Sequence, residues 1–159
     1  MNHTVCVDVD VASTVTSVPE QSEIHAWVTE VIQELAVDRD CEVSIRIVDE
    51  EEGRALNKRF CNIDKATNVL SFPSNSASIA GMVPAIPCLL GDIVICGPIV
   101  EREAAAQHKV LAAHWAHLLV HGTLHLLGHD HESESEAVAM EAIETRILNR
   151  RGVKDPYIA

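Results

Sequence analysis

Residues 111–127 form an almost wholly apolar segment that nevertheless carries four histidines. Because apolar residues occur all round the predicted helix, this helix is expected to lie at the centre of the domain. At about 100° per residue, one stripe about 80° wide holds all four histidines, His114, His117, His121 and His125. Burying an imidazole destabilises the folded state unless the ring is hydrogen-bonded or bound to a metal. The fold must therefore both bury this helix and satisfy its histidines.

The rest of the chain predicts a small sheet covered by helices. Alternating polarity predicts strands at 4–11 and 41–49, and further strands are expected at 67–72 and, as a largely apolar run, at 89–97. Helices are expected at about 17–37, at 50–60 with Asp49 as its cap, and at 98–108, 111–127 and 133–150. The stretch 73–88, with three prolines, predicts a long loop. We expect one α+β domain over residues 1–159, with a mixed four-stranded sheet, about five helices, a central histidine-bearing helix and an extended tail from about 151.

The end of the central helix has the spacing of a metal site. His121 and His125 are four residues apart, so both imidazoles can reach one ion. Gly128 can end the helix with a left-handed turn and bring His131 back toward them. Three imidazoles with an open fourth position are typical of a catalytic zinc site, one ion per chain. We therefore predict His121, His125 and His131 as the ligands, and not His129.

The residue that follows His121 limits which reactions a bound metal could catalyse. The pattern H-x3-H-x2-G-x2-H matches that of metzincin proteases, whose general-base glutamate follows the first histidine. Here that position holds Gly122. Peptide hydrolysis by that route is disfavoured, and hydrolysis of another polar bond, such as a phosphodiester, is favoured.

Four segments together resemble the YbeY family of bacterial endoribonucleases, also called rRNA maturation factors. They are "ATNVLSFP", "LLGDIVIC", "HGTLHLLGHDH" and the terminal "DPY", in that order, and the resemblance runs from about Val43 onward. It implies an α+β metalloprotein that binds zinc through His121, His125 and His131. It also implies cleavage of single-stranded RNA in the maturation of the 16S 3′ end and in ribosome quality control. Small-subunit ribosomal proteins and an assembly GTPase are the implied partners.

Two positions depart from the family pattern. His129 replaces a tyrosine, which leaves the predicted ligands intact. Cys61 stands where the family carries an arginine that is thought to contact phosphate, and a cysteine supplies no fixed positive charge. On a helix, Arg59 points about 200° away from position 61. Either a nearby base takes the role or phosphate stabilisation is weaker in this chain.

The remaining candidate residues are basic or polar. The net charge of −12 disfavours nonspecific phosphate binding, but residues 53–66 carry four basic residues against one acid. Candidate substrate-binding residues are Lys58, Arg59, Lys65 and Ser71, and candidate catalytic groups are Arg59 and His114. Thr67 and Asn68 could line a substrate-binding cleft together with Ser71, or they could simply end a strand.

The histidine pattern and the family resemblance leave three functions open. No export signal and no apolar run of membrane-spanning length are seen, so we expect a cytoplasmic protein. The first hypothesis is a zinc-dependent endoribonuclease acting on ribosomal RNA precursors. The second is another metal-dependent hydrolase, such as a protease or amidase. The third is a noncatalytic assembly factor that contains zinc, which Cys61 favours.

Overall fold

The structure is a computed structural model that describes residues 3–74, 89–130, 132–154 and 156. A four-stranded sheet has the order β1-β2-β4-β3. Its strands are β1 (Val5–Ala12), β2 (Cys41–Val48), β3 (Val69–Pro73) and β4 (Leu89–Cys96). β1, β2 and β4 are parallel, whereas β3 runs antiparallel to β4 at one edge. The sheet is therefore mixed, as the sequence predicted.

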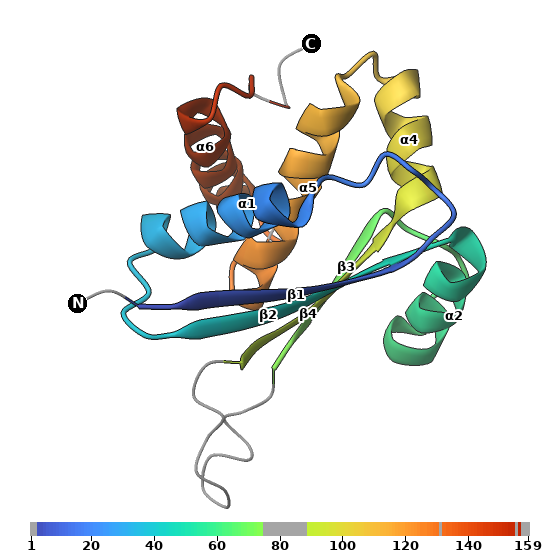
Figure 1. Ribbon diagram of the computed structural model, residues 1–159, viewed down its shortest axis with the longest axis horizontal. Helices are drawn as coiled ribbons and strands as arrows, with labels where there is room; N and C mark the ends of the chain where they lie inside the picture. Colours follow the sequence, from blue (N-terminus) through green and yellow to red (C-terminus); the bar gives the residue numbers. More distant parts are fainter. Residues whose placement is uncertain (1–2, 75–88, 131, 155, 157–159) are drawn as a thin grey trace, which may run out of the picture.

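Five helices lie within the described ranges (Figure 1). They are α1 (Gln21–Glu34), α2 (Glu50–Cys61), α4 (Gly97–Ala106), α5 (Leu111–Leu126) and α6 (Glu134–Arg150). The fold prediction is confirmed, with helix and strand ends shifted by a few residues. The predicted loop at 73–88 lies almost entirely outside the described residues, as do residues 155 and 157–159 of the predicted tail.

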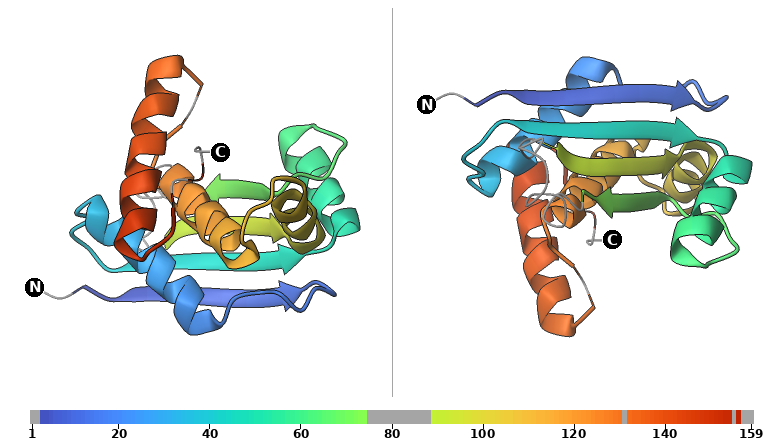
Figure 2. Two further views of the ribbon diagram at one scale, coloured as in Figure 1. Left: turned by 90° about the horizontal axis from the view of Figure 1, so that it is seen from above. Right: turned by 90° about the horizontal axis from the view of Figure 1, so that it is seen from below.

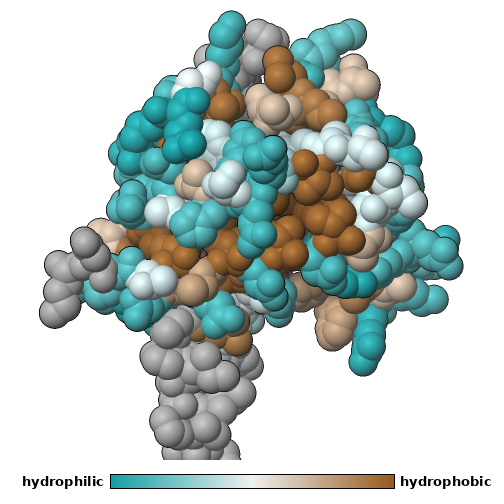
Figure 3. All heavy atoms as spheres, viewed as in Figure 1, coloured by the Kyte–Doolittle hydropathy of each residue, from teal (hydrophilic) through white to brown (hydrophobic). Residues whose placement is uncertain are grey.

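The two faces of the sheet carry different helices. α1, α5 and α6 lie on one face, and α2 lies on the other (Figures 1 and 2). The main core joins Val43, Ile45 and Ile93 of the strands to Trp27 of α1 and Leu119 of α5. A smaller apolar cluster, Val48, Val94 and Cys96, lies on the second face with neighbours from α2, α4 and β3. On the face seen in Figure 3, apolar side chains form a band across the middle of the molecule between hydrophilic zones.

α5 is central because nearly all of it is buried. Ten of its residues are buried, and Leu119, Val120 and Leu124 have no exposed surface. It contacts α1, α4, α6, β3 and β4. Fully burying one such aliphatic side chain stabilises the fold by about 1.5–3 kcal/mol. α5 is thus a rigid support for the side chains on its remaining stripe.

Asp49 occupies the cap position of α2, but its side chain does not cap the helix as predicted. It instead accepts hydrogen bonds from the Ser13 hydroxyl, at 2.5 Å, and the Thr14 backbone N–H, at 3.1 Å. The Ser13 hydrogen bond is the main reason why the pKa of Asp49 is lowered. The carboxylate therefore ties the end of β1 to the start of α2, a contact between distant segments that local sequence cannot reveal.

Among the described residues, no helix combines the length and the apolar character that crossing a bilayer requires.

Candidate metal centre

The four histidines of α5 do form one row. Successive ring centroids lie 6.2, 6.1 and 4.6 Å apart from His114 through His117 and His121 to His125. The predicted stripe is therefore present, and the closest pair is at its C-terminal end. This pair is also the one that the spacing selected as metal ligands.

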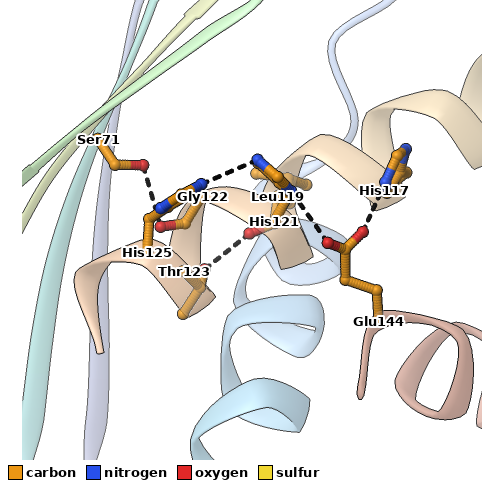
Figure 4. A network of polar contacts seen from close by, with 8 residues as sticks. All are labelled: Ser71, His117, Leu119, His121, Gly122, Thr123, His125 and Glu144. Atoms are coloured by element: carbon orange, nitrogen blue, oxygen red, sulfur yellow. Dashed lines mark hydrogen bonds and ion pairs between the residues drawn. The ribbon is translucent and has the colours of Figure 1, made fainter. Parts of the chain in front are cut away.

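His121 and His125 turn the same ring nitrogen toward one another (Figure 4). Their Nε2 atoms are 3.0 Å apart, and both side chains are partly exposed. Zinc–nitrogen bonds of about 2.0–2.1 Å in a tetrahedral site put two ligand nitrogens about 3.3 Å apart. The pair therefore fits a shared metal ion after an opening of a few tenths of an ångström. Partial exposure leaves this point accessible to a substrate.

Glu144 of α6 supports the histidine pair from behind. Its side chain is only 1% exposed, and its carboxylate lies between two imidazoles (Figure 4). His117 Nε2 donates to one oxygen at 2.7 Å, and His121 Nδ1 donates to the other at 3.0 Å. An imidazole that donates from Nδ1 keeps the lone pair on Nε2 for a metal. Glu144 thus fixes the tautomer that His121 needs as a ligand.

The charge of Glu144 is stabilised by these same contacts. Burial alone would raise its pKa, but the hydrogen bonds from His117 and His121 outweigh burial and lower the pKa to about 2. The carboxylate is therefore ionised at neutral pH, in the form that accepts both N–H groups.

Sequence reasoning did not identify Glu144, although a signal was present. It lies four residues after Met140 and three before Ile147, on the face of α6 that faces the core. A glutamate at a core position is rarely buried without a partner. The histidine stripe on α5 is the partner that this position required.

His117, His121 and Glu144 also form a metal-compatible group by themselves. One ligand atom from each lies within 4.8 Å of the others. This arrangement would use Nδ1 of His121, whereas the pair with His125 uses Nε2. Glu144 is almost fully buried, and both oxygens already accept hydrogen bonds from imidazoles. The partly exposed His121–His125 pair is therefore better suited to a metal that must reach a substrate.

The turn that follows α5 has the predicted form. Gly128 has φ = 92°, in the left-handed region that favours glycine. The His129 backbone N–H donates to the Leu124 carbonyl at 3.1 Å, so the chain turns sharply at the helix end. His131, the predicted third ligand, lies outside the described residues and its role stays a prediction.

Gly122 allows α5 to approach the sheet closely. A Cβ atom there would lie 3.1 Å from Ile93 Cγ2 and 3.4 Å from the Ser71 hydroxyl. That hydroxyl donates to the Gly122 carbonyl at 3.0 Å (Figure 4). A side chain at position 122 would thus point into packed β-strands. Metzincins have their glutamate at this position, whereas in this chain the position packs against the sheet and accepts the hydrogen bond from Ser71.

His114 is held by a separate set of contacts. Its side chain is 4% exposed, and its Nε2 lies 2.9 Å from a carboxylate oxygen of Glu103, which also accepts from the Asn68 amide at 3.0 Å. Burial is the main reason why the pKa of His114 is lowered. His114 is therefore a neutral imidazole two turns before His121. Asn68, a predicted cleft residue, is engaged with Glu103.

The structure does not place the predicted basic residues beside the histidines. Lys58 and Arg59 are exposed in the last turn of α2, and the Arg59 guanidinium lies 5.1 Å from the ring centroid of Phe60. Phe60 contacts Phe72 of β3, whose side chain joins the α2 face of the sheet. Ser71, the neighbouring residue, points to α5. The edge strand β3 thus separates these cations from the metal centre.

Lys65 and Cys61 belong to the same region. Both are exposed, Cys61 as the last residue of α2 and Lys65 in the connection to β3. The Lys65 carbonyl accepts a hydrogen bond from the Asn57 amide at 2.8 Å, which holds the connection against the helix. Arg54 is paired with Asp64 at 2.7 Å. The exposed cations of this segment without such a pair are therefore Lys58, Arg59 and Lys65, within the described ranges.

Comparisons with known proteins agree with the sequence resemblance. A family model described as Endoribonuclease YbeY matches residues 9–152. Proteins named Endoribonuclease YbeY from Cellvibrio japonicus and Halorhodospira halophila are 47% and 50% identical to the chain. The first match covers 95% of this chain and 82% of the relative, and the second covers 89% of each. The relative from Xylella fastidiosa is 51% identical, over 90% of this chain and 87% of its own length.

The fold also resembles a solved structure. The solution structure of TM1509 from Thermotoga maritima matches with a TM-score of 0.54 at 21% identity. The match covers 95% of this chain and 99% of the other. At this identity, the match supports the shared fold alone.

Proposed function

Because the chain belongs to the endoribonuclease YbeY family, we propose that it is a zinc-dependent endoribonuclease that cleaves single-stranded RNA. Its proposed role is maturation of the 16S 3′ end and ribosome quality control. The observation that carries the proposal is the convergence of His121 and His125 at 3.0 Å, with His121 held by a buried carboxylate. Ribosomal RNA precursors are the proposed substrates, and the cytoplasm is the proposed location.

The proposed ligands are His121, His125 and His131. Zinc bound there would supply a Lewis acid and a water of lowered pKa. Glu144 holds His121 in the ligand tautomer, and α5 holds both imidazoles rigidly because its other sides are packed in the core. His114, two turns earlier in the same row, remains a candidate catalytic group.

Lys58, Arg59, Lys65 and Ser71 remain proposed RNA contacts. The three cations lie on the opposite side of edge strand β3 from the histidines, and they have no ion-pair partner among the described residues. An RNA strand that crosses edge strand β3 can contact the histidines on one side and the cations on the other. These cations would therefore bind phosphates away from the scissile bond. Arg59 would then act through binding, and its kinetic effect would be on KM.

The proposal is tested by incubating metal-loaded protein with single-stranded RNA and with the same RNA annealed to its complement. We expect internal cleavage of the single strand, and little cleavage of the duplex. His125→Ala should abolish cleavage, whereas the matched control His25→Ala, on α1, should retain it. Equal cleavage by His125→Ala and wild type would contradict the proposal.

A noncatalytic assembly factor is the second candidate, and the observation that favours it is the exposed Cys61 at the arginine position. Fully metal-loaded protein that binds RNA without cutting it would establish this alternative. Small-subunit ribosomal proteins and an assembly GTPase are the proposed partners in both cases. The close contact at Gly122 disfavours a protease, because it leaves no room for the glutamate base.

A further inference from the structure

A cleft of about 600 Å³ lies beside the N-terminal half of α5, at the opposite end of the histidine row from the His121–His125 pair. It opens between α1, α5 and the segment after α6. Figure 1 shows the start of α5 and the end of α6 at the same end of the molecule. Trp27, Ala113, His114 and His117 are among the lining residues, together with Val153. The volume is within the range of about 300–1,000 Å³ that is usual for small-molecule sites.

The charge of this cleft differs from that of the whole chain. Among its described lining residues, Lys109, Arg151 and Lys154 are basic and Glu23 is the single acid. Lys109 and Lys154 form no ion pair with any described residue, and Arg151 lies 3.7 Å from Glu30 and 5.4 Å from the Trp27 ring centroid. A local cation excess on a chain of net charge −12 favours an anionic ligand.

Two other clefts in the described part of the chain lack this excess. The one beside α2 is lined by Arg54 and Lys58 but also by Glu50, Glu51 and Asp64. The one on the α2 face of the sheet has a single cation, Arg46, against four acids, Asp8, Asp10, Glu52 and Asp92. Of these three clefts, the one at the start of α5 is therefore best suited to phosphate.

The floor of the cleft contains an unsatisfied polar atom. His114 is 4% exposed, and its Nε2 faces Glu103 at 2.9 Å. Its Nδ1 is buried with no hydrogen-bond partner among the described residues. Buried polar atoms in native proteins are nearly always satisfied, by protein, ordered water or ligand. Since Nε2 donates to the carboxylate, Nδ1 is an acceptor beneath the surface of the cleft, which a ligand N–H reaches only if the His114 ring moves.

His117 links the cleft to the candidate metal centre through hydrogen bonds. His117 lines the cleft and donates to Glu144, which in turn accepts from His121. His117 and His121 are one helical turn apart, about 6 Å along the axis. A ligand that contacts His117 in the cleft would therefore lie about one helical turn from the His121–His125 pair.

We propose that this cleft binds one unstacked nucleotide of the RNA substrate, next to the bond that is cut. The base lies on the apolar floor with His114 and His117, and Lys109, Lys154 and Arg151 contact the adjoining phosphates. Single-stranded RNA is suited to this site because its bases can leave the stack and enter a pocket. The inference rests on the proposed endoribonuclease function, since it identifies where the substrate of that same centre is held.

The experiment measures binding of a fluorescent 2′-O-methyl RNA to metal-loaded protein over a range of salt concentrations, and a denaturing gel after each titration verifies that the RNA is intact. The test variant is Lys109→Ala/Lys154→Ala. The matched control is Arg39→Ala/Arg146→Ala, which removes two exposed cations away from the cleft. Circular dichroism verifies that both variants are folded.

The test variant should bind at least about tenfold more weakly than wild type. Its plot of log affinity against log salt should be shallower by about 1.4, since each lost single-strand phosphate contact removes about 0.7. The control should stay within about twofold of wild type. Equal affinities of the test variant and the control would overturn the inference, and so would a loss seen only in Lys58→Ala/Arg59→Ala/Lys65→Ala.

Cleavage by the wild type separates this inference from the proposed function. Cleavage of unmodified RNA together with unchanged binding by the cleft variant overturns the cleft and leaves the nuclease intact. Weaker binding by the cleft variant without any cleavage by wild type supports the cleft as an RNA site and overturns the nuclease.

Discussion

At the scale of single residues, the two ring nitrogens of His121 have different partners, and this leaves Nε2 available to bind a metal. Its Nδ1 is committed to Glu144, and its Nε2 faces His125. The sequence predicted the second contact from the i, i+4 spacing, because that spacing is local to one helix. It could not predict the first, because Glu144 lies on another helix and 23 residues away.

Glu144→Gln should weaken metal binding by about 10–100-fold, the usual effect of losing the carboxylate behind a histidine ligand. The neutral amide can offer an N–H where His121 needs an acceptor. Competition against a chelator of known affinity measures the change. The control Glu141→Gln, one turn earlier on α6, should bind metal like wild type. An affinity of Glu144→Gln within about twofold of wild type would show that Glu144 does not position the ligand.

Cys61→Arg should strengthen RNA binding and raise cleavage. Position 61 is exposed at the end of α2, so an arginine fits without repacking and adds one cation to the group of Lys58, Arg59 and Lys65. One additional phosphate contact steepens the salt dependence by about 0.7. RNA cleavage at several salt concentrations provides the measurement. Unchanged or lower cleavage would mean that this position does not limit activity.

At the scale of elements, α5 approaches the sheet closely because position 122 is a glycine. The spacing of metal ligands does not by itself require a glycine there. Gly122 lies over Ile93 and Ser71, so its place in the sequence is set by packing. The helix, its stripe of histidines and its glycine turn were predictable, since all three depend on local spacing. The close approach to β3 and β4 was not, because it depends on which face of the sheet α5 covers.

Two glycine substitutions should therefore have opposite effects. At Gly122, overpacking against Ile93 at 3.1 Å costs about 1–3 kcal/mol, more than the gain of about 1 kcal/mol in helix propensity. At Gly53 in α2, the nearest atom to a new Cβ is 3.5 Å away, so the propensity gain prevails. Urea denaturation should show Gly122→Ala less stable and Gly53→Ala more stable than wild type. Stabilisation by Gly122→Ala would contradict the close packing.

At the scale of the whole molecule, the metal centre lies on a fold that has its own core. Apolar residues from three strands, α1, α5 and α6 pack together without any contribution from the histidines. Sequence patterns predicted this architecture, because the first two strands alternate in polarity, the fourth is a largely apolar run, and the helices are amphipathic or apolar. They did not predict the position of α2, whose basic end lies across β3 from the histidines. That placement depends on strand order, which alternation does not encode.

Removing the metal should lower the melting temperature and leave the protein folded. A ligand that binds only the native state at about 100 times its Kd stabilises it by about 2.7 kcal/mol. Thermal melts followed by circular dichroism, with and without a chelator, measure the difference. A chelator-treated protein without a cooperative transition would show that the metal is needed for folding.

We propose that one metal ion at His121 and His125 carries the RNA-cleaving activity. The most direct measurement is metal stoichiometry together with RNA cleavage for His121→Ala, His125→Ala and the control His25→Ala. We predict one equivalent of zinc and full cleavage for wild type and the control, and loss of both in the two ligand variants. Full zinc stoichiometry or undiminished cleavage in either ligand variant would contradict the account.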